Sequence, residues 1–461
     1  MIRQLLDPRF VKARVGDVAT YLARKEKLLE KLSPGVRKDA GKAGVTPSDL
    51  EQARQLLAEL ESRGDFSRNE REAAWMPRDP GLGIVQSALE EFYRTKQGTT
   101  RAVAPRGLEA LPDPVSDDSL TPDWVPTAKR SFMRQMEQSD LIGWGLSFAV
   151  AKAIAGARGK AAFPRQKDPV AIESKVRLIL MGDWGTGVRR AQNVGEQIKE
   201  QLKPAKAGDR QCHVIHLGDV YYAGREFEYE RLKNSWPVKE SDASRVGSWC
   251  LNGNHDMYSG GRPLFDFLTR DRRFSRQKGC SYFALENADW LIFGLDSAYE
   301  SDGPKGDLGG LAAPQTEWIM TQIRRAPRKK VILLSHHQPF SAWENQSPAM
   351  VAKLEPLLKG PREVAAWFWG HEHRCAVYEG AHNIRYPALI GHGGVPVYAS
   401  RKGPDPAKEK VVFWDQRSFP HLLEHYAYLG FAVLDLDGPQ GSVRYLDENG
   451  KPTKRDPDRV E

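Results

Sequence analysis

The sequence predicts an α/β fold in its later part, preceded by a helical region. From about residue 175 onward, short apolar runs alternate with stretches of helical periodicity. Most of these runs end in a loop that carries Asp, Asn or His, and ligands of parallel sheets bind at such strand ends. With 461 residues, 40% hydrophobic and 28% charged, the chain is expected to be a folded soluble protein rather than a disordered one or a membrane-spanning bundle.

Residues 1–170 are expected to form a helical accessory region whose role the sequence does not define. Apolar positions recur at helical spacing within 11–32, 50–60 and 84–92. The apolar run 141–157 is shorter than the ~20 residues of a spanning helix, so we expect a buried or docking helix there. Basic residues shortly after this run leave interfacial contact with a membrane open as an alternative.

Residues 171–461 are expected to form the catalytic domain, which begins with a strand–helix–strand unit. The apolar runs 176–181 and 213–217 each precede Gly-Asp, and a helical stripe over 191–202 lies between them. Further elements of the same alternating pattern are strands at 282–285, 290–296, 331–335 and 365–370 and a helix around 316–323.

Histidine and cysteine are absent from the first 200 residues. All 11 histidines and all four cysteines lie beyond residue 210. The cysteines show no CxxC spacing and the chain opens without an apolar signal segment, which favours a cytoplasmic protein. His213 and His216 lie in an apolar run and are interpreted as core side chains. The net charge of +8 is mild, and we find no clear nucleic-acid motif.

Five short motifs follow the expected strands and carry metal-binding types of side chain. In chain order they are GDWG (182–185), GDVYY (218–222), GNHD (253–256), SHHQP (335–339) and GHEH (370–373). A single Gly-Asp after a strand is usually a turn, but five such motifs in one order are hard to explain as turns. Carboxylates, imidazoles, an amide oxygen and a phenol suit a pair of transition-metal ions better than Ca²⁺ or Mg²⁺.

A pair of such ions explains why no serine triad or phosphate-binding glycine loop is evident. Two ions about 3.5 to 4 Å apart on one shared carboxylate serve in-line displacement at phosphorus. They generate hydroxide near neutral pH and neutralise charge on the phosphoryl oxygens. The motifs therefore predict a hydrolase that acts on phosphate esters.

In this order the motifs resemble those of the calcineurin-like metallophosphoesterases, and within them the purple acid phosphatase branch. Gly185 stands where most of that superfamily has a metal-binding His, and the branch without this His uses a Tyr that corresponds to Tyr222. The resemblance implies a metallophosphoesterase-type β-sandwich flanked by helices, in αββα layers.

The resemblance also implies two sets of metal ligands. The first metal would be bound by Asp183, Asp219, Tyr222 and His373, and the second by Asp219, Asn254, His336 and His371. A tyrosinate favours Fe(III) in the first site, with Fe, Mn or Zn in the second. Strand register favours His336 as the ligand and the spacing to the following Pro favours His337, so both stay open.

The remaining roles concern catalysis. His255 is expected to face the substrate and donate a proton or hydrogen bond to it, while Asp256 orients the His255 ring and raises its pKa. The expected reaction is phosphomonoester hydrolysis by in-line attack of a metal-bound hydroxide on a small-molecule substrate. Phosphodiester hydrolysis of cyclic nucleotides, nucleic acids or phospholipid head groups is the alternative, and a non-catalytic scaffold on the same fold is a third possibility.

Overall fold

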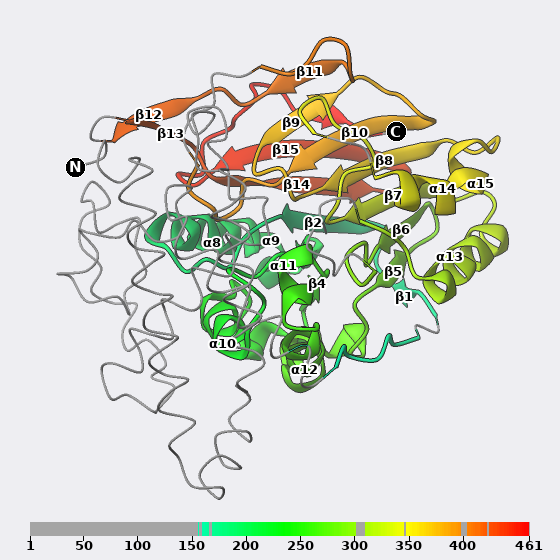
Figure 1. Ribbon diagram of the computed structural model, residues 1–461, viewed down its shortest axis with the longest axis horizontal. Coiled ribbons are helices and arrows are strands. Elements are labelled where there is room, and N and C mark those ends of the chain that lie inside the picture. Colours follow the sequence, from blue (N-terminus) through cyan, green and yellow to red (C-terminus); the bar gives the residue numbers. More distant parts are fainter. Residues whose placement is uncertain are drawn as a thin grey trace, which may run out of the picture.

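The computed structural model describes residue 155 and residues 159–165, 168–300, 309–344, 347–397, 403–421 and 424–460. The helices expected within 11–92, and all of the run 141–157 except Ala155, lie outside these residues. Two sheets pack face to face, with helices α8–α12 gathered on one side and α13–α15 on the other (Figure 1). The αββα fold that the sequence predicts is therefore confirmed.

The six-stranded sheet is built around the first strand–helix–strand unit. Its strands are β2 (Lys175–Met181), β3 (Gln211–His216), β4 (Val246–Cys250), β14 (Gly430–Asp437), β15 (Gln440–Asp447) and β16 (Asp458–Arg459). Their order is β16-β15-β14-β2-β3-β4, with β2, β3 and β4 parallel and β14 antiparallel to β2. Helix α8 (Arg189–Gln201) follows β2 and leads toward the parallel strand β3, as the sequence predicts.

The eight-stranded sheet forms the second layer. Its strands are β1 (Val170–Ala171), β5 (Phe283–Glu286), β6 (Trp290–Gly294), β7 (Lys330–Ser335), β8 (Val364–Trp369), β9 (Cys375–Tyr378), β10 (Ile384–Ile390) and β11 (Val411–Trp414), in the order β1-β5-β6-β7-β8-β10-β9-β11. β6, β7, β8 and β10 are parallel neighbours. A separate antiparallel pair consists of β12 (Ser418–His421) and β13 (Glu424–Ala427).

The helices cover the outer faces of the two sheets. On the side of the six-stranded sheet lie α8, α9 (Lys203–Ala207), α10 (Glu226–Ser235), α11 (Asn254–Tyr258) and α12 (Arg262–Arg270). On the side of the eight-stranded sheet lie α13 (Ala313–Arg325), α14 (Pro348–Lys353) and α15 (Glu355–Leu358). No helix among the described residues is long and apolar enough to cross a membrane.

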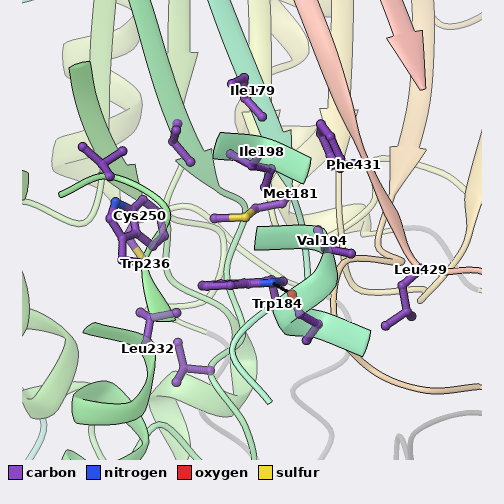
Figure 2. Packing of buried hydrophobic residues seen from close by; sticks show 14 of the residues in the cluster. Ile179, Met181, Trp184, Val194, Ile198, Leu232, Trp236, Cys250, Leu429 and Phe431 are labelled. Atoms are coloured by element: carbon purple, nitrogen blue, oxygen red, sulfur yellow. Dashed lines mark hydrogen bonds between the residues drawn. The ribbon is translucent and has the colours of Figure 1, made fainter. Parts of the chain in front are cut away.

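Alternation along β2 explains how the layers are held together. Leu178 and Leu180 face the other sheet, whereas Ile179 and Met181 face the helices, because successive strand side chains point to opposite sides. Figure 2 shows Ile198 of α8 close to this helix-facing pair. Ile179, Met181 and Ile198 belong to one buried cluster. Their packing fixes the end of β2, where the first motif begins.

The described residues before β1 pack against the loops of the catalytic domain. The Ala161 N–H donates to the Gly260 carbonyl at 2.9 Å, and the Tyr299 hydroxyl donates to the Ala161 carbonyl at 2.7 Å. The Phe163 ring stacks on Tyr282, with ring centroids 5.3 Å apart. The boundary near residue 170 stays a prediction, and residues 159–165 already contact the domain that follows.

His213 is a core histidine, as the sequence predicts, and it makes a pH dependence of stability testable. Its Nδ1 accepts a hydrogen bond from Trp249 Nε1 at 3.0 Å, and burial lowers its pKa to about 3. A base with a lowered pKa stabilises the fold fully above its ordinary value near 6.5, and this stability is lost as the pH falls toward 3. The loss amounts to about 2 kcal/mol at pH 5.

We therefore expect His213→Gln, which keeps a hydrogen-bond acceptor, to flatten the fall in unfolding free energy between pH 7 and pH 5. Urea denaturation at the two pH values measures this fall. The same substitution at the surface His382 serves as the control and should leave the wild-type slope. An equal fall in unfolding free energy in the wild type and in His213→Gln would show that His213 is not its source.

Candidate metal centre

The five motifs meet at one edge of the sandwich because their strands end there. Asp183 and Asp219 follow the parallel strands β2 and β3, and Asn254 opens α11 after β4. His336 follows β7, and His371 and His373 follow β8. Strands of both sheets therefore direct ligand-type side chains into one region, and each of these six side chains is at most 9% exposed.

The backbone at this edge is strained. Asp183, Asp219, His371 and His373 have φ values of +58°, +69°, +72° and +47°, in the left-handed region that side chains other than Gly rarely adopt. Such conformations persist where the surrounding structure enforces them, and they concentrate at functional sites. Gly253 allows its backbone to approach Asp219 closely. A Cβ at this position would clash with the carboxylate, because it would lie 2.0 Å from Asp219 Oδ1.

The first group of ligand atoms surrounds a tyrosine hydroxyl. Tyr221 Oη lies 2.6 Å from Asp183 Oδ1, 3.0 Å from Asp219 Oδ2 and 3.0 Å from His373 Nε2. His373 Nε2 is itself 3.3 Å from Asp183 Oδ1. Tyr221 Oη therefore contacts three other potential metal ligands, which are two carboxylates and an imidazole.

The tyrosine in this group is Tyr221, whereas the resemblance implies Tyr222. Tyr222 is buried and contributes its backbone to the site: its N–H donates to the Glu228 carboxylate, and its carbonyl lies 2.5 Å from His255 Nδ1. Sequence reasoning missed Tyr221 because the motif places two tyrosines side by side after β3. The doubled tyrosine was the available signal, but only the path of the loop tells the two apart.

The second group of ligand atoms surrounds His336. Its Nε2 lies 3.0 Å from Asn254 Oδ1, 3.3 Å from Asp219 Oδ2 and 3.2 Å from His371 Nδ1. Its Nδ1 is 3.1 Å from the carbonyl of Leu217, which can only accept, so Nδ1 carries a hydrogen, and Nε2 is the nitrogen that could bind a metal once it has lost its own proton. Asp219 Oδ2 belongs to both groups.

The spacing of these atoms fits bound transition-metal ions. Ligands about 2.1 Å from one ion at angles of 90° to 110° lie about 3.0 to 3.4 Å from each other. Most of the separations in the two groups fall in or near this range, from 2.6 to 3.3 Å. The sets Asp183–Asp219–His336 and His336–His337–His371 each bring their ligand atoms within 4.8 Å of one another. The residues present can therefore hold one cation or two.

The charges in the site are also those of a cation-binding centre. Burial opposes ionisation of Asp219, but the neighbouring imidazoles of His336 and His255 hold the pKa of Asp219 well below its usual range. Burial likewise opposes protonation of His336, but the nearby carboxylates, Asp219 foremost, raise its pKa to about 9. Without a metal, a proton on the His336 ring therefore supplies positive charge in the site, and metal binding would displace this proton.

The structure brings His336, rather than His337, to the ligand atoms of Asp219 and Asn254. The neighbouring His337 is turned to Ser297, whose Oγ lies 3.0 Å from its Nδ1 and accepts its backbone N–H at 3.1 Å. Strand register therefore indicates the residue that the structure places in the second group, and its role as a metal ligand stays a prediction. Ser297 lies between two elements, β6 and α13, and sequence reasoning did not single it out.

His255 lies beside both groups, where the sequence places a residue that faces the substrate. Its Nε2 is 3.9 Å from Asp219 Oδ2, and its Nδ1 contacts the Tyr222 carbonyl. Because a carbonyl only accepts, Nδ1 carries the hydrogen, and Nε2 donates only when the ring is protonated. Burial lowers the pKa of His255 despite the nearby Asp219 charge, so the expectation of a raised pKa is wrong for this structure.

Asp256 organises the loop backbone, contrary to the expectation that it orients His255. Its Oδ1 accepts from Val220 N–H at 3.1 Å and Tyr229 O–H at 2.6 Å. Its Oδ2 accepts from Asp219 N–H at 3.1 Å and Gly253 N–H at 2.8 Å. Burial and the Asp219 charge raise the pKa of Asp256 to about 7, and the hydrogen bonds from Tyr229, Gly253 and Val220 oppose this rise.

We expect Asp256→Asn to destabilise the fold. Whichever position the amide nitrogen takes, two donors then face a group that cannot accept, and each unsatisfied buried group costs about 1–3 kcal/mol. Urea denaturation should show a loss of roughly 3 kcal/mol relative to the wild type. The exposed Asp266→Asn is the matched control, and a loss no larger than in this control would be incompatible with the organising role.

The fold and the site together define a class of protein. Residues 176–375 match the calcineurin-like phosphoesterase family. All five motifs lie inside this stretch. This part of the chain therefore matches the calcineurin-like phosphoesterases, the family that its motifs resemble.

Two curated relatives match parts of the chain. A probable glycerophosphodiester phosphodiesterase from Arcobacter nitrofigilis is 28% identical over 171 residues, which are 35% of this chain and 57% of the relative. A 3′,5′-cyclic-nucleotide phosphodiesterase from Nostoc is 23% identical over 177 residues, 38% of this chain and 59% of the relative. The chain spans less than two thirds of the length of either relative.

Similarity to solved structures is more distant. GAP50, the anchor in the inner membrane complex of Plasmodium, is 13% identical, with 63% of this chain and 89% of that chain covered at a TM-score of 0.45. The sulfate thiohydrolase SoxB of Thermus thermophilus is 11% identical, with 63% and 59% covered at a TM-score of 0.34.

Proposed function

We propose that the chain is a binuclear metal-dependent hydrolase of phosphate esters. The observation that carries the proposal is the position of Asp219 Oδ2, which lies 3.0 Å from Tyr221 Oη in the first group and 3.3 Å from His336 Nε2 in the second. One carboxylate oxygen shared by two ligand groups is the arrangement that holds two ions close enough to act on one phosphoryl group. When bound, the ions would supply an activated water and neutralise phosphoryl charge.

The side chains of the site would bind the two ions and contact the substrate. Asp183, Tyr221 and His373, with Asp219, would bind the first ion, and Asn254, His336 and His371, with Asp219, the second. His255 is 5% exposed beside both groups, where its Nε2 can contact a substrate oxygen. Binding of an anionic phosphate there would raise its pKa and favour the protonated ring, which can then donate to the leaving oxygen.

The phenol in the first group supports a phosphomonoester as substrate and Fe(III) as its ion. Gly185 offers no ligand at the position of the family's usual His, and Tyr221 Oη contacts Asp183 and His373 in the first group. A tyrosine in place of this His resembles the purple acid phosphatase branch, but the tyrosine of that branch corresponds to Tyr222 and not to Tyr221. The second ion would be Fe, Mn or Zn, which imidazole and carboxylate ligands both accept.

Phosphodiester hydrolysis is the second candidate, and it is favoured by the relatives. The two curated proteins described above are both named as phosphodiesterases. The ligand groups serve either reaction, because the ester that is cleaved depends on loops outside the metal-binding motifs.

Turnover of para-nitrophenyl phosphate and bis-para-nitrophenyl phosphate by the full chain, loaded with Fe, Mn or Zn, separates the two candidates. We expect the monoester to be the faster substrate. A faster diester would overturn the monoester assignment and keep the phosphoesterase, whereas no metal binding and no turnover of either ester would overturn both.

A further inference from the structure

Tyr258 is a buried tyrosine at the end of α11, the helix that carries Asn254 and His255. Its side chain is 1% exposed, and it follows His255 by three residues and Asn254 by four. Residues three and four apart are neighbours on the surface of a helix, so one side chain can contact both. Tyr258 contacts both, through different parts of its side chain.

The hydroxyl of Tyr258 holds the amide of Asn254. Asn254 Nδ2 donates to Tyr258 Oη at 2.8 Å, while Oδ1 of the same amide lies 3.0 Å from His336 Nε2 in the second ligand group. Only the oxygen of an amide can bind a metal ion, and its two ends have nearly the same shape. The Tyr258 hydroxyl gives the nitrogen end a buried hydrogen-bond partner, and it therefore favours the orientation in which the oxygen faces the second group.

The ring of Tyr258 packs on the imidazole of His255. The two ring centroids are 4.8 Å apart, and the Tyr221 ring lies 4.8 Å from the same imidazole. His255 Nδ1 is 2.5 Å from the Tyr222 carbonyl. These contacts fix the direction of His255 Nε2, the atom that would meet the leaving oxygen of a substrate.

We infer that Tyr258 is a positioning residue with two separable functions: its hydroxyl orients Asn254 for the second metal ion, and its ring orients His255 for the leaving group. The inference rests on the proposed function and adds to it a residue outside the five motifs. Two substitutions separate the functions. Tyr258→Phe removes only the hydroxyl, whereas Tyr258→Leu removes the aromatic ring as well.

Calorimetric titration of the metal-free full chain with Zn²⁺ tests the hydroxyl without any turnover. Tyr258→Phe should weaken the ion of the second ligand group by about 10-fold and leave the other ion unchanged, as loss of an outer partner of a metal ligand does. In an Asn254→Ala background, which lacks the amide, Tyr258→Phe should change the affinity by no more than about twofold. Tyr386→Phe is the matched control, because it removes a buried hydroxyl that donates to Asp458 at 2.6 Å, outside the ligand groups. It should bind both ions as the wild type does.

Turnover at saturating Zn²⁺ tests the ring. A proton donor matters most for a poor leaving group, because a good one departs without protonation. Tyr258→Leu should therefore lower kcat by about 10-fold more for phenyl phosphate than for para-nitrophenyl phosphate. Tyr258→Phe keeps the ring and should leave the ratio of the two rates at its wild-type value. A general loosening of the fold would lower both rates alike.

The two functions can fail separately. Binding of both ions by Tyr258→Phe within about twofold of the wild type would overturn the role of the hydroxyl, and so would a further 10-fold loss in the Asn254→Ala background. An unchanged ratio of rates in Tyr258→Leu would overturn the role of the ring. If Tyr258→Leu does not fold, Tyr258→Met takes its place in this comparison. A wild type that binds fewer than two ions, or hydrolyses neither ester, would instead refute the proposed function.

Discussion

Asp219→Asn will bind neither metal ion tightly and will lose on the order of 10³-fold or more in kcat/KM for phosphate esters. The side chain is 1% exposed, and its Oδ2 contacts both Tyr221 and His336. An amide removes the negative charge that offsets two cations and replaces one acceptor oxygen with a group that cannot bind metal. Both ions should therefore be affected by a single substitution.

Metal content after dialysis and kcat/KM with para-nitrophenyl phosphate measure the two effects together. Asp435→Asn is the control, because Asp435 is a carboxylate on β14 that pairs with Arg177 at 2.7 Å and takes no part in the ligand groups. The control should keep both ions and full turnover. An Asp219→Asn protein that retains two ions would show that Asp219 is not the bridge.

Tyr221→Phe and Tyr222→Phe will differ sharply, although the two residues are neighbours. Burial and the carboxylates of Asp183 and Asp219 raise the pKa of Tyr221 well above its usual range, so its phenolate needs a bound cation. An iron(III) ion in the first group would supply that charge and would give a visible charge-transfer band. Tyr221→Phe should lose this band, weaken the first ion and lower kcat/KM by about 10²-fold, on the scale of losing one preorganised electrostatic contact.

Tyr222→Phe is the matched comparison, because it removes a buried hydroxyl of the same kind from the next position. It should keep the colour and the first ion, since Tyr222 contributes its backbone to the site. The spectrum of the iron-loaded proteins decides between them. If only Tyr222→Phe loses the band, Tyr222 is the metal ligand, as the resemblance implies, and Tyr221 is not.

The strands and their layers were predictable because they depend on local patterns. The run 176–181 is apolar on both faces since one face meets the second sheet and the other meets helix α8. The same logic extends to His336, because a residue directly after a strand inherits its direction from the register. Periodicity and strand ends therefore sufficed for the sheets and for most candidate ligands.

The contacts of Tyr221, Ser297 and Asp256 were not predictable, because each depends on segments distant in sequence. Asp256 directly follows His255 in the GNHD motif and therefore looks like its partner. Its carboxylate oxygens instead accept hydrogen bonds from the loop after β3 and from α10. No pattern within one motif reports such contacts. For Tyr221, the loop direction after β3 decides which of two adjacent rings enters the site.

The contacts of residues 159–165 determine where the chain can be shortened. Phe163 stacks on Tyr282 and lies 4.7 Å from the Tyr299 ring, and Ala161 bonds to Gly260 beyond α11. A protein that begins at residue 171 would expose both tyrosine rings to solvent, and exposed aromatic patches promote aggregation. Poor solubility of such a fragment would then say nothing about the N-terminal region. A cut just before Gly159 keeps this aromatic cover and isolates what the first 158 residues contribute.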